Sequence, residues 1–235
     1  MAATAHVPGP VKSMDSSIML LQDVPICHMD SHSKVPESDI VSNEIMHNGV
    51  WEHAETVNIL ARLEEWKQAK QQGSSGVVLL DVGANVGWFT LQAAAMGYHV
   101  LAVEPMPRNQ GALRRTLCEN QKLAEKVTLI PKGLSDKPRK CQLYVLKSNK
   151  GNGTPVCEGA AFANLKDSPE YELAGEFPLT TLDEVFKGTM EALADRVQVV
   201  KIDVEGFEPQ VYATLTTRCG VQLAPCCQTC HAFFF

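Results

Sequence analysis

The stretch LDVGANVGWFT, residues 80–90, constrains the fold of this chain more than any other segment. The apolar run at 77–80 predicts a buried strand, the glycines of 83–87 predict a tight turn, and the apolar stretch 88–96 predicts a helix. This order of strand, glycine turn and helix is typical of the first unit of a parallel α/β sheet. Ligands of such sheets bind beyond the carboxyl ends of the strands, so the turn is the first candidate for a ligand site.

Strand and helix patterns alternate along the rest of the chain, which favours an α/β fold. An amphipathic helix is predicted from Glu44 to about residue 70, and a short helix is predicted after Thr181, with Glu184 at the capping-box spacing. Residues 147–178, rich in Gly, Asn, Pro and Glu, are interpreted as a long insertion that shapes a substrate site. The other predicted elements are strands at 99–104, 127–131 and 197–203, a helix at 107–122 and an added hairpin strand at 141–146.

The composition limits the classes of protein to consider. With 235 residues, 45% of them hydrophobic, the chain can bury the core of one sizeable domain. Its net charge of -6, without a cluster of basic residues, argues against nucleic acid as a partner. No apolar run approaches the roughly 18 residues that a membrane helix needs. These features predict a soluble cytoplasmic protein, although the irregular first segment leaves an organelle open. The sequence indicates no oligomeric state.

The eight cysteines fall into two groups. Cys27, Cys118, Cys141 and Cys157 are scattered singly, and we expect buried or free thiols there instead of a disulfide framework. The remaining four lie near the C-terminal end, where residues 227–231 match the C-x-x-C-H pattern of haem attachment. A zinc site in the same segment is a further alternative. The favoured interpretation is that these cysteines hold no metal.

The glycine turn does not match a dinucleotide fingerprint. That fingerprint, G-x-G-x-x-G, brings the backbone close to a pyrophosphate. Here Gly83 holds the first position, but Asn85 and Trp88 replace the second and third glycines. A ligand without phosphates at this turn therefore fits better.

S-adenosylmethionine is such a ligand. It needs close backbone approach at Gly83 and Gly87, and its positive charges favour a carboxylate such as Asp81. Glu104, at the end of the second predicted strand, can accept hydrogen bonds from both ribose hydroxyls. Enzymes that bind NAD also have a carboxylate at this position, so Glu104 does not distinguish the two cofactors. The alternative to any ligand site is that the segment is only a tight turn between a strand and a helix.

Five segments in this order resemble the FkbM family of class I S-adenosylmethionine-dependent methyltransferases: DVGANVGWFTLQAA, HVLAVEPMPRN, VTLIPKGLSD, TTLDE and VVKIDVEGFEPQV. The resemblance runs from about Trp51 to Tyr212. It implies a Rossmann-like, doubly wound, mostly parallel sheet and methyl transfer, typically to a hydroxyl oxygen of a sugar or small natural product. It also implies the cofactor residues, which are Asp81, Gly83, Asn85 and Gly87 around the methionine part, Glu104 at the ribose, and Ser135 and Asp136 near the adenine.

The fourth predicted strand carries the candidates for chemistry. Alternation places Lys201, Asp203 and Glu205 on one face, so three charged groups should meet at its carboxyl end. Methyl transfer to a hydroxyl needs positioning and a base, and Asp203 or Glu205 suits that role. The alternative is an ion pair of Lys201 with a carboxylate that only orients the loop. Two carboxylates without a third ligand are a weak metal site, so we expect no metal.

The chain departs from the family pattern after Tyr212. We divide it into an irregular leader at 1–42, a partial methyltransferase-like domain at 43–215 and an atypical Cys-rich tail at 216–235. A complete family member would continue with a helix and about three strands, so we expect the fourth strand to lack its neighbours. Two other hypotheses stay open: a non-catalytic product that binds a partner through its sheet edge, and an NAD(P)-dependent oxidoreductase.

Overall fold

The computed structural model of the protein describes residues 40–70, 73–157, 163–187, 190–218 and 231–234. Its larger sheet has five strands in the order β3-β2-β1-β8-β9, and every neighbouring pair is parallel. The bounds are β1 Val78–Val82, β2 His99–Val103, β3 Val127–Ile130, β8 Val197–Ile202 and β9 His231–Phe234. The order reverses between β1 and β8, and this switch point is where open α/β sheets bind ligands.

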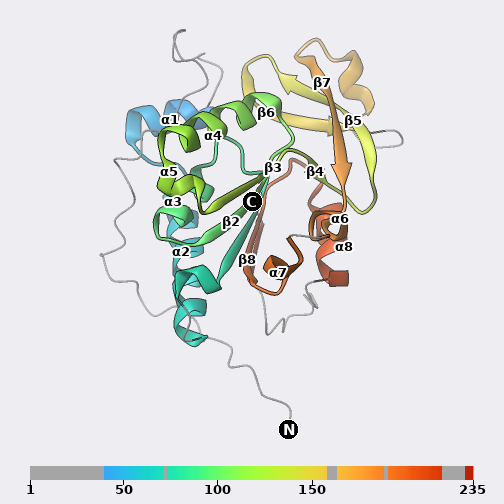
Figure 1. Ribbon diagram of the computed structural model, residues 1–235. Helices are drawn as coiled ribbons and strands as arrows, with labels where there is room; N and C mark the ends of the chain where they lie inside the picture. Colours follow the sequence, from blue (N-terminus) through green and yellow to red (C-terminus); the bar gives the residue numbers. More distant parts are fainter. Residues whose placement is uncertain (1–39, 71–72, 158–162, 188–189, 219–230, 235) are drawn as a thin grey trace.

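Helices cover both faces of the larger sheet (Figure 1). The group on one side is α1 Ile40–Asn48, α2 His53–Ala69, α3 Trp88–Ala95, α4 Pro107–Glu119 and α5 Gln121–Ala124. The group on the other side is α6 Leu182–Val185, α7 Glu191–Ala194 and α8 Glu208–Arg218. The alternating pattern predicted this α/β fold, and the doubly wound arrangement is the one that the family resemblance implied.

The central strands are buried on both faces, which explains their continuous apolar sequences. Every residue of β1 and of β8 is buried. Along β1, Leu79 packs among residues of α2 and α3, whereas Leu80 packs with Leu182 and Phe186 on the opposite side. Alternate side chains of one strand therefore stabilise both helical layers.

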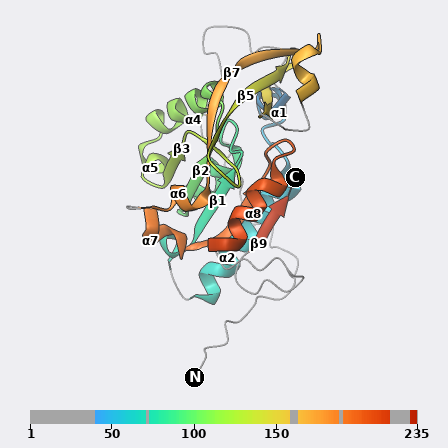
Figure 2. The same cartoon turned by 90° about the vertical axis from the view of Figure 1, so that its right-hand side faces the viewer.

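A second, four-stranded sheet lies over the carboxyl end of the larger one, with the order β4-β7-β5-β6 (Figures 1 and 2). Its strands are β4 Gly133–Leu134, β5 Arg139–Leu146, β6 Asn149–Val156 and β7 Tyr171–Thr180. The expected hairpin strand at 141–146 is thus confirmed. The insertion predicted at 147–178 contains two strands that its Gly- and Pro-rich sequence did not indicate, β6 and β7, which form because their backbones pair with β5.

Two expectations about cysteines and edges are corrected. Cys141 and Cys157 form a disulfide that joins the start of β5 to the end of β6, so they are not free thiols. The strand β8 does not lack a neighbour, because β9 pairs with it in parallel. Cys118 is an exposed free thiol, as expected. Three further predictions concern segments outside the described residues: Cys27, the leader as far as residue 39, and the C-x-x-C segment of the tail.

Two local predictions can be compared directly with the structure. Thr181 caps α6, and its Oγ1 accepts a hydrogen bond from the Glu184 backbone N–H at 3.2 Å, as the capping-box spacing predicted. The single helix predicted from Glu44 to residue 70 is instead two helices, α1 and α2. Gly49 and Glu52, both with positive φ, separate them.

Within the described ranges, no helix is both long and apolar enough to cross a bilayer. The same part of the chain contains no group of three or more His, Cys, Asp or Glu side chains arranged to hold a metal ion.

Candidate functional site

The two glycines of the first turn are required by conformation and by packing. Gly83 has a φ of +80°, and a Cβ at this position would lie 1.7 Å from the backbone oxygen of Asp203. Gly87 has a φ of +95°, and its Cβ would lie 2.5 Å from Leu113 of α4. Gly83 lines a pocket at the sheet edge, whereas Gly87 brings α4 against the start of α3. The turn is therefore tight because β1, β8 and α4 meet there.

Asp81 and Lys201 form a buried ion pair beneath this turn. Lys201 is 2% exposed, and its Nζ donates a hydrogen bond to the Gly83 carbonyl at 2.7 Å. The same Nζ lies 3.5 Å from Asp81 Oδ1 and 3.7 Å from Asp203 Oδ2. Asp81 also accepts a 2.6 Å hydrogen bond from Thr90. These contacts join β8 to the turn after β1, and they place Asp81 below the pocket floor instead of on its wall.

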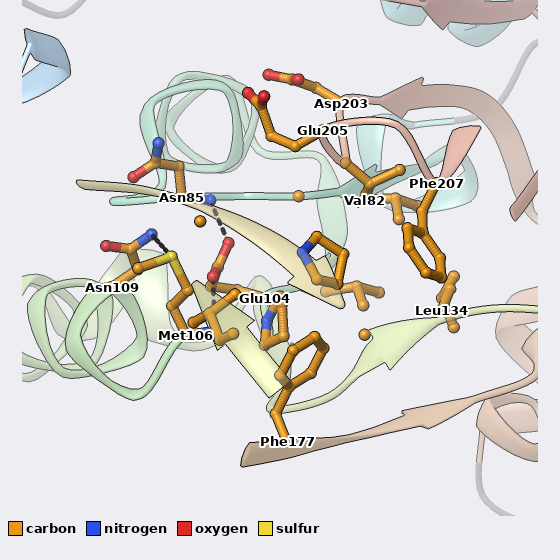
Figure 3. A pocket seen from close by; sticks show the side chains of 18 of the residues that line it. Val82, Asn85, Glu104, Met106, Asn109, Leu134, Phe177, Asp203, Glu205 and Phe207 are labelled. Carbon is orange, nitrogen blue, oxygen red and sulfur yellow. Dashed lines mark hydrogen bonds between the residues drawn. The ribbon is translucent and has the colours of Figure 1, made fainter. Parts of the chain in front are cut away.

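Glu104 stands at the end of β2 with its carboxylate facing the turn (Figure 3). It is 3% exposed, and its two oxygens accept hydrogen bonds of 2.8 Å from the backbone N–H groups of Asn85 and Met106. Burial raises the pKa of Glu104 to about 7, while these two hydrogen bonds and Lys201 lower it. Each oxygen keeps a further lone pair, so the group can still accept donors from a ligand.

A narrow pocket opens beside Glu104. One wall comes from the ends of β1, β2 and β8, and the opposite wall is apolar and comes largely from the second sheet. Figure 3 shows Phe177 and Leu134 across this pocket from the Glu104 carboxylate. The apolar side chains of that wall are Leu134, Leu143, Pro155, Phe177, Leu179 and Phe207. Such a wall suits a flat aromatic base.

Ser135 and Asp136 are not among the residues that line this pocket. Ser135 is fully buried and donates a 2.8 Å hydrogen bond to Asp136, which also pairs with Arg139. The residues of that segment that reach the pocket are Gly133 and Leu134.

The loop after β8 carries two further carboxylates. Asp203, with a side chain 35% exposed, and the exposed Glu205 line the pocket mouth (Figure 3). Glu208 fixes the loop, because its Oε1 accepts hydrogen bonds from the backbone N–H groups of Val204 and Gly206 at 3.1 and 3.2 Å. The three charged residues predicted to converge at this strand end therefore do so, although Lys201 points beneath the turn.

A wider pocket, of about 790 Å³, adjoins the narrow one and shares Asn85, Asp203 and Glu205 with it. Aromatic side chains from several elements form part of its wall: Trp51, Trp88, Phe89 and Tyr171. Trp88 thus lies on the wider pocket, and its Nε1 donates a 2.9 Å hydrogen bond to Thr56 of α2. A volume of this size is typical of small-molecule sites.

The sequence predicted β5 and an insertion that shapes a substrate site, but it did not identify the strands β6 and β7 or the residues on them that form the pocket walls. Glu52, on the wide pocket, precedes an ordinary amphipathic helix and belongs to no motif. Met106 and Asn109 were not assigned to the site, although both lie in the segment HVLAVEPMPRN that resembles the family, two and five residues after Glu104.

The model of the FkbM methyltransferase domain matches residues 81–219, more than half of the chain. This match assigns a methyltransferase domain to the chain, and the topology agrees with the Rossmann-like fold of that class. The chain belongs to the FkbM methyltransferase family, as the five segments of its sequence indicated. No curated protein matches the chain.

Several solved structures are similar to this chain at low identity. Methyltransferase FkbM from Methylobacillus flagellatus KT is 11% identical with a TM-score of 0.39, over 77% of this chain and 47% of that one. Precorrin-6y C5,15-methyltransferase from Geobacter metallireducens GS-15 is 16% identical with a TM-score of 0.36, over 72% and 58%. The bifunctional kinase-methyltransferase WbdD is 15% identical with a TM-score of 0.33, over 48% and 22%. The chain thus spans less than two thirds of each of these proteins.

Proposed function

We propose that the protein is an S-adenosylmethionine-dependent O-methyltransferase that acts on a hydroxyl group of a sugar or small natural product. The observation that carries the proposal is Glu104, a buried carboxylate beside a pocket with an apolar wall and further carboxylates at its mouth. A nucleoside supplies hydroxyl donors for Glu104 and a flat base for the wall. A sulfonium supplies a positive charge for Asp203 and Glu205.

The donor set agrees with this cofactor better than with a dinucleotide. The carboxylates near the pocket would repel a pyrophosphate, and two glycines of the dinucleotide fingerprint are absent. Glu104 would hold the ribose of the cofactor. Gly83 and Asn85 would hold its methionine part. Asp81, Gly87 and Lys201 would keep the turn in shape. Ser135 and Asp136 are retained as predicted neighbours of the adenine, behind the wall formed by Leu134.

The narrow pocket holds about 60 Å³, so it takes only part of such a cofactor. The remainder would extend past Asn85 into the wide pocket, where the acceptor also binds. When bound, the cofactor supplies an electrophilic methyl group. The chain positions the acceptor hydroxyl against it and removes a proton, for which the sequence nominated Asp203 and Glu205.

The first experiment is calorimetric titration of the purified chain with S-adenosylmethionine, S-adenosylhomocysteine and NAD in parallel. We expect binding of the first two alone. Glu104→Gln should weaken both roughly 10- to 100-fold, because hydrogen bonds to a charged acceptor are lost. Glu125→Gln, at an exposed position, is the matched control. Binding of NAD alone, or no binding by a folded chain, would overturn the proposal.

The second experiment identifies the reaction. The chain is incubated with methyl-labelled S-adenosylmethionine and a panel of methyl glycosides and polyhydroxylated natural products. Transfer of label to oxygen is the expected result, and transfer to nitrogen or carbon would contradict the O-methyltransferase assignment.

A further inference from the structure

The wide pocket contains a carboxylate that no motif explains. Glu52 lies just before α2, where its backbone has a φ of 41° and a ψ of 62°. This left-handed conformation is uncommon for a residue other than glycine, and strained residues of this kind cluster at functional sites. The Oε2 atom of Glu52 is buried and has no hydrogen-bond partner within the described part of the chain.

The surroundings of Glu52 raise the pKa of its carboxyl group above the ordinary value. Burial raises its pKa, and the charge of Asp203 raises it further, as does Glu55 on the same helix. Lys201 and a hydrogen bond from the Trp51 side chain lower it. The other carboxylates that face the wide pocket are Glu205 and Glu208. A carboxylate with a raised pKa in a ligand pocket is suited to accept a proton.

A chain of hydrogen bonds fixes Glu52 relative to the turn after β1. The Glu52 carbonyl accepts bonds of 2.9 Å from both the backbone N–H and the Oγ1 of Thr56. Thr56 Oγ1 in turn accepts the 2.9 Å bond from Trp88 Nε1. Trp88 is the first residue of α3, directly after the glycine turn. The position of Glu52 is therefore tied to the segment that would hold the cofactor.

We propose that the wide pocket is the acceptor site and that Glu52 is the catalytic residue that takes the proton from the acceptor hydroxyl. This inference rests on the proposed function. In the transfer, the acceptor oxygen forms a bond to the methyl carbon, the carbon–sulfur bond breaks and its electron pair stays on sulfur. The hydroxyl proton moves to the Glu52 carboxylate, and S-adenosylhomocysteine and the methyl ether are the products.

Glu52 is better placed for this role than the two carboxylates after β8. Asp203 Oδ2 lies 3.7 Å from Lys201 Nζ, so this carboxylate already has a cation as its neighbour. Glu205 is exposed to water, which weakens its interaction with a bound hydroxyl. Glu52 combines a buried oxygen atom, an open hydrogen-bonding position and a place on the pocket wall.

The first test uses glycidol, a small hydroxylated epoxide, on the unaltered chain with and without S-adenosylhomocysteine. A carboxylate oxygen bonds to an epoxide carbon, the ring carbon–oxygen bond breaks, and water protonates the released oxygen. Mass spectrometry locates the ester. We expect label at Glu52 in preference to the exposed Glu125, and we expect it to persist when S-adenosylhomocysteine is bound. Label at Asp203 or Glu205 without Glu52, or no label on these three, would overturn the inference.

The second test separates an acceptor role from a cofactor role. Glu52→Gln should leave the Kd for S-adenosylhomocysteine unchanged and lower kcat for a panel acceptor by roughly 10²- to 10⁴-fold, with loss of the acidic limb of the pH profile. If Glu52→Gln weakens S-adenosylhomocysteine binding, or if that ligand blocks the glycidol label, Glu52 belongs to the cofactor side and the inference fails. If the unaltered chain does not bind S-adenosylhomocysteine, the proposed function itself fails.

Discussion

At the scale of single residues, the protonation state of Glu104 controls what the narrow pocket can bind. Burial raises the pKa of Glu104 to about 7, and only the ionised form can accept a hydrogen bond at every oxygen lone pair. We therefore expect S-adenosylhomocysteine affinity to rise as the pH increases towards 7 and to level above it, with a slope of up to about tenfold per pH unit below the pKa. Calorimetry from pH 5.5 to 8.5 measures this, and a flat profile would contradict it.

The same group has the opposite effect on the stability of the ligand-free chain. Its pKa in the folded state lies above its ordinary value of 4.5. Its contribution to stability is therefore complete below about pH 4.5 and is lost as the pH rises through about 7. Glu104→Gln should remove this loss, which pH-dependent urea denaturation can measure.

Gly83 provides a second prediction at this scale. Gly83→Ala would combine a φ of +80° with a Cβ 1.7 Å from the Asp203 backbone oxygen, so β1 and the loop after β8 must separate. We expect a loss of about 3 kcal/mol or more in the free energy of unfolding. Gly111→Ala is the matched control, because Gly111 lies in α4 with nothing within 4 Å of its Cβ, and this change should stabilise by about 0.5–1 kcal/mol. Equal effects of the two changes would contradict the argument.

At the scale of elements, Lys201 links β8 to the turn after β1. Lys201→Met would leave the fully buried Asp81 without its cation, and we expect a loss of about 3–5 kcal/mol of stability. The double variant Asp81→Asn with Lys201→Met should lose less, since neither charge then remains buried. Lys187→Met, which breaks an exposed pair with Glu184, should cost no more than about 1 kcal/mol. Urea denaturation of the three variants measures these differences.

The disulfide between Cys141 and Cys157 connects two strands of the second sheet, with a sequence separation of 16. Its removal in the variant Cys141→Ala with Cys157→Ala should lower the free energy of unfolding by about 3 kcal/mol, the value for a loop of this length. The unaltered chain in reducing agent should show a similar loss, whereas Cys118→Ala should show none. Equal stability with and without reductant would contradict this expectation.

The sequence predicted best those strands that are buried on both faces, because burial on both faces requires apolar residues along the whole strand. The strands β1, β2 and β8 are covered on both faces, and so their apolar runs stand out. The strand β6 reads NKGNGTPV, which carries no strand pattern, and it forms because β5 pairs with it. For the site, Asp203 and Glu205 do lie at the sheet edge, but the predicted strand alternation is not the reason, because β8 ends at Ile202 and Glu205 has a φ of 53° in the loop that follows. The position of Glu52 on the pocket wall depends on how α2 packs against α3, and no local pattern of the sequence predicts that contact.

At the scale of the whole molecule, the wide pocket is acidic. Glu52, Asp203, Glu205 and Glu208 line it against the single cation Lys201 of that lining, within a chain of net charge -6. We expect a phosphorylated form of any acceptor found in the panel to have at least about a tenfold lower kcat/KM than the neutral form, because like charges repel. Raising the salt concentration should reduce the difference. Equal rates for both forms would contradict this assignment of the pocket.

The second sheet is inserted between β3 and α6 and supplies a wall to each pocket, while the carboxylates after β8 and Glu104 belong to the larger sheet. Recognition and chemistry are thus encoded by separate stretches of the gene. Exchange of residues 133–180 among family members would change the walls of both pockets, the cofactor wall around Leu134 included, while Glu104, Asp203 and Glu205 would stay in place. Such an arrangement lets new specificities evolve by recombination or loop mutation on an unchanged catalytic frame, and it marks this segment as the place to diversify in a directed-evolution library.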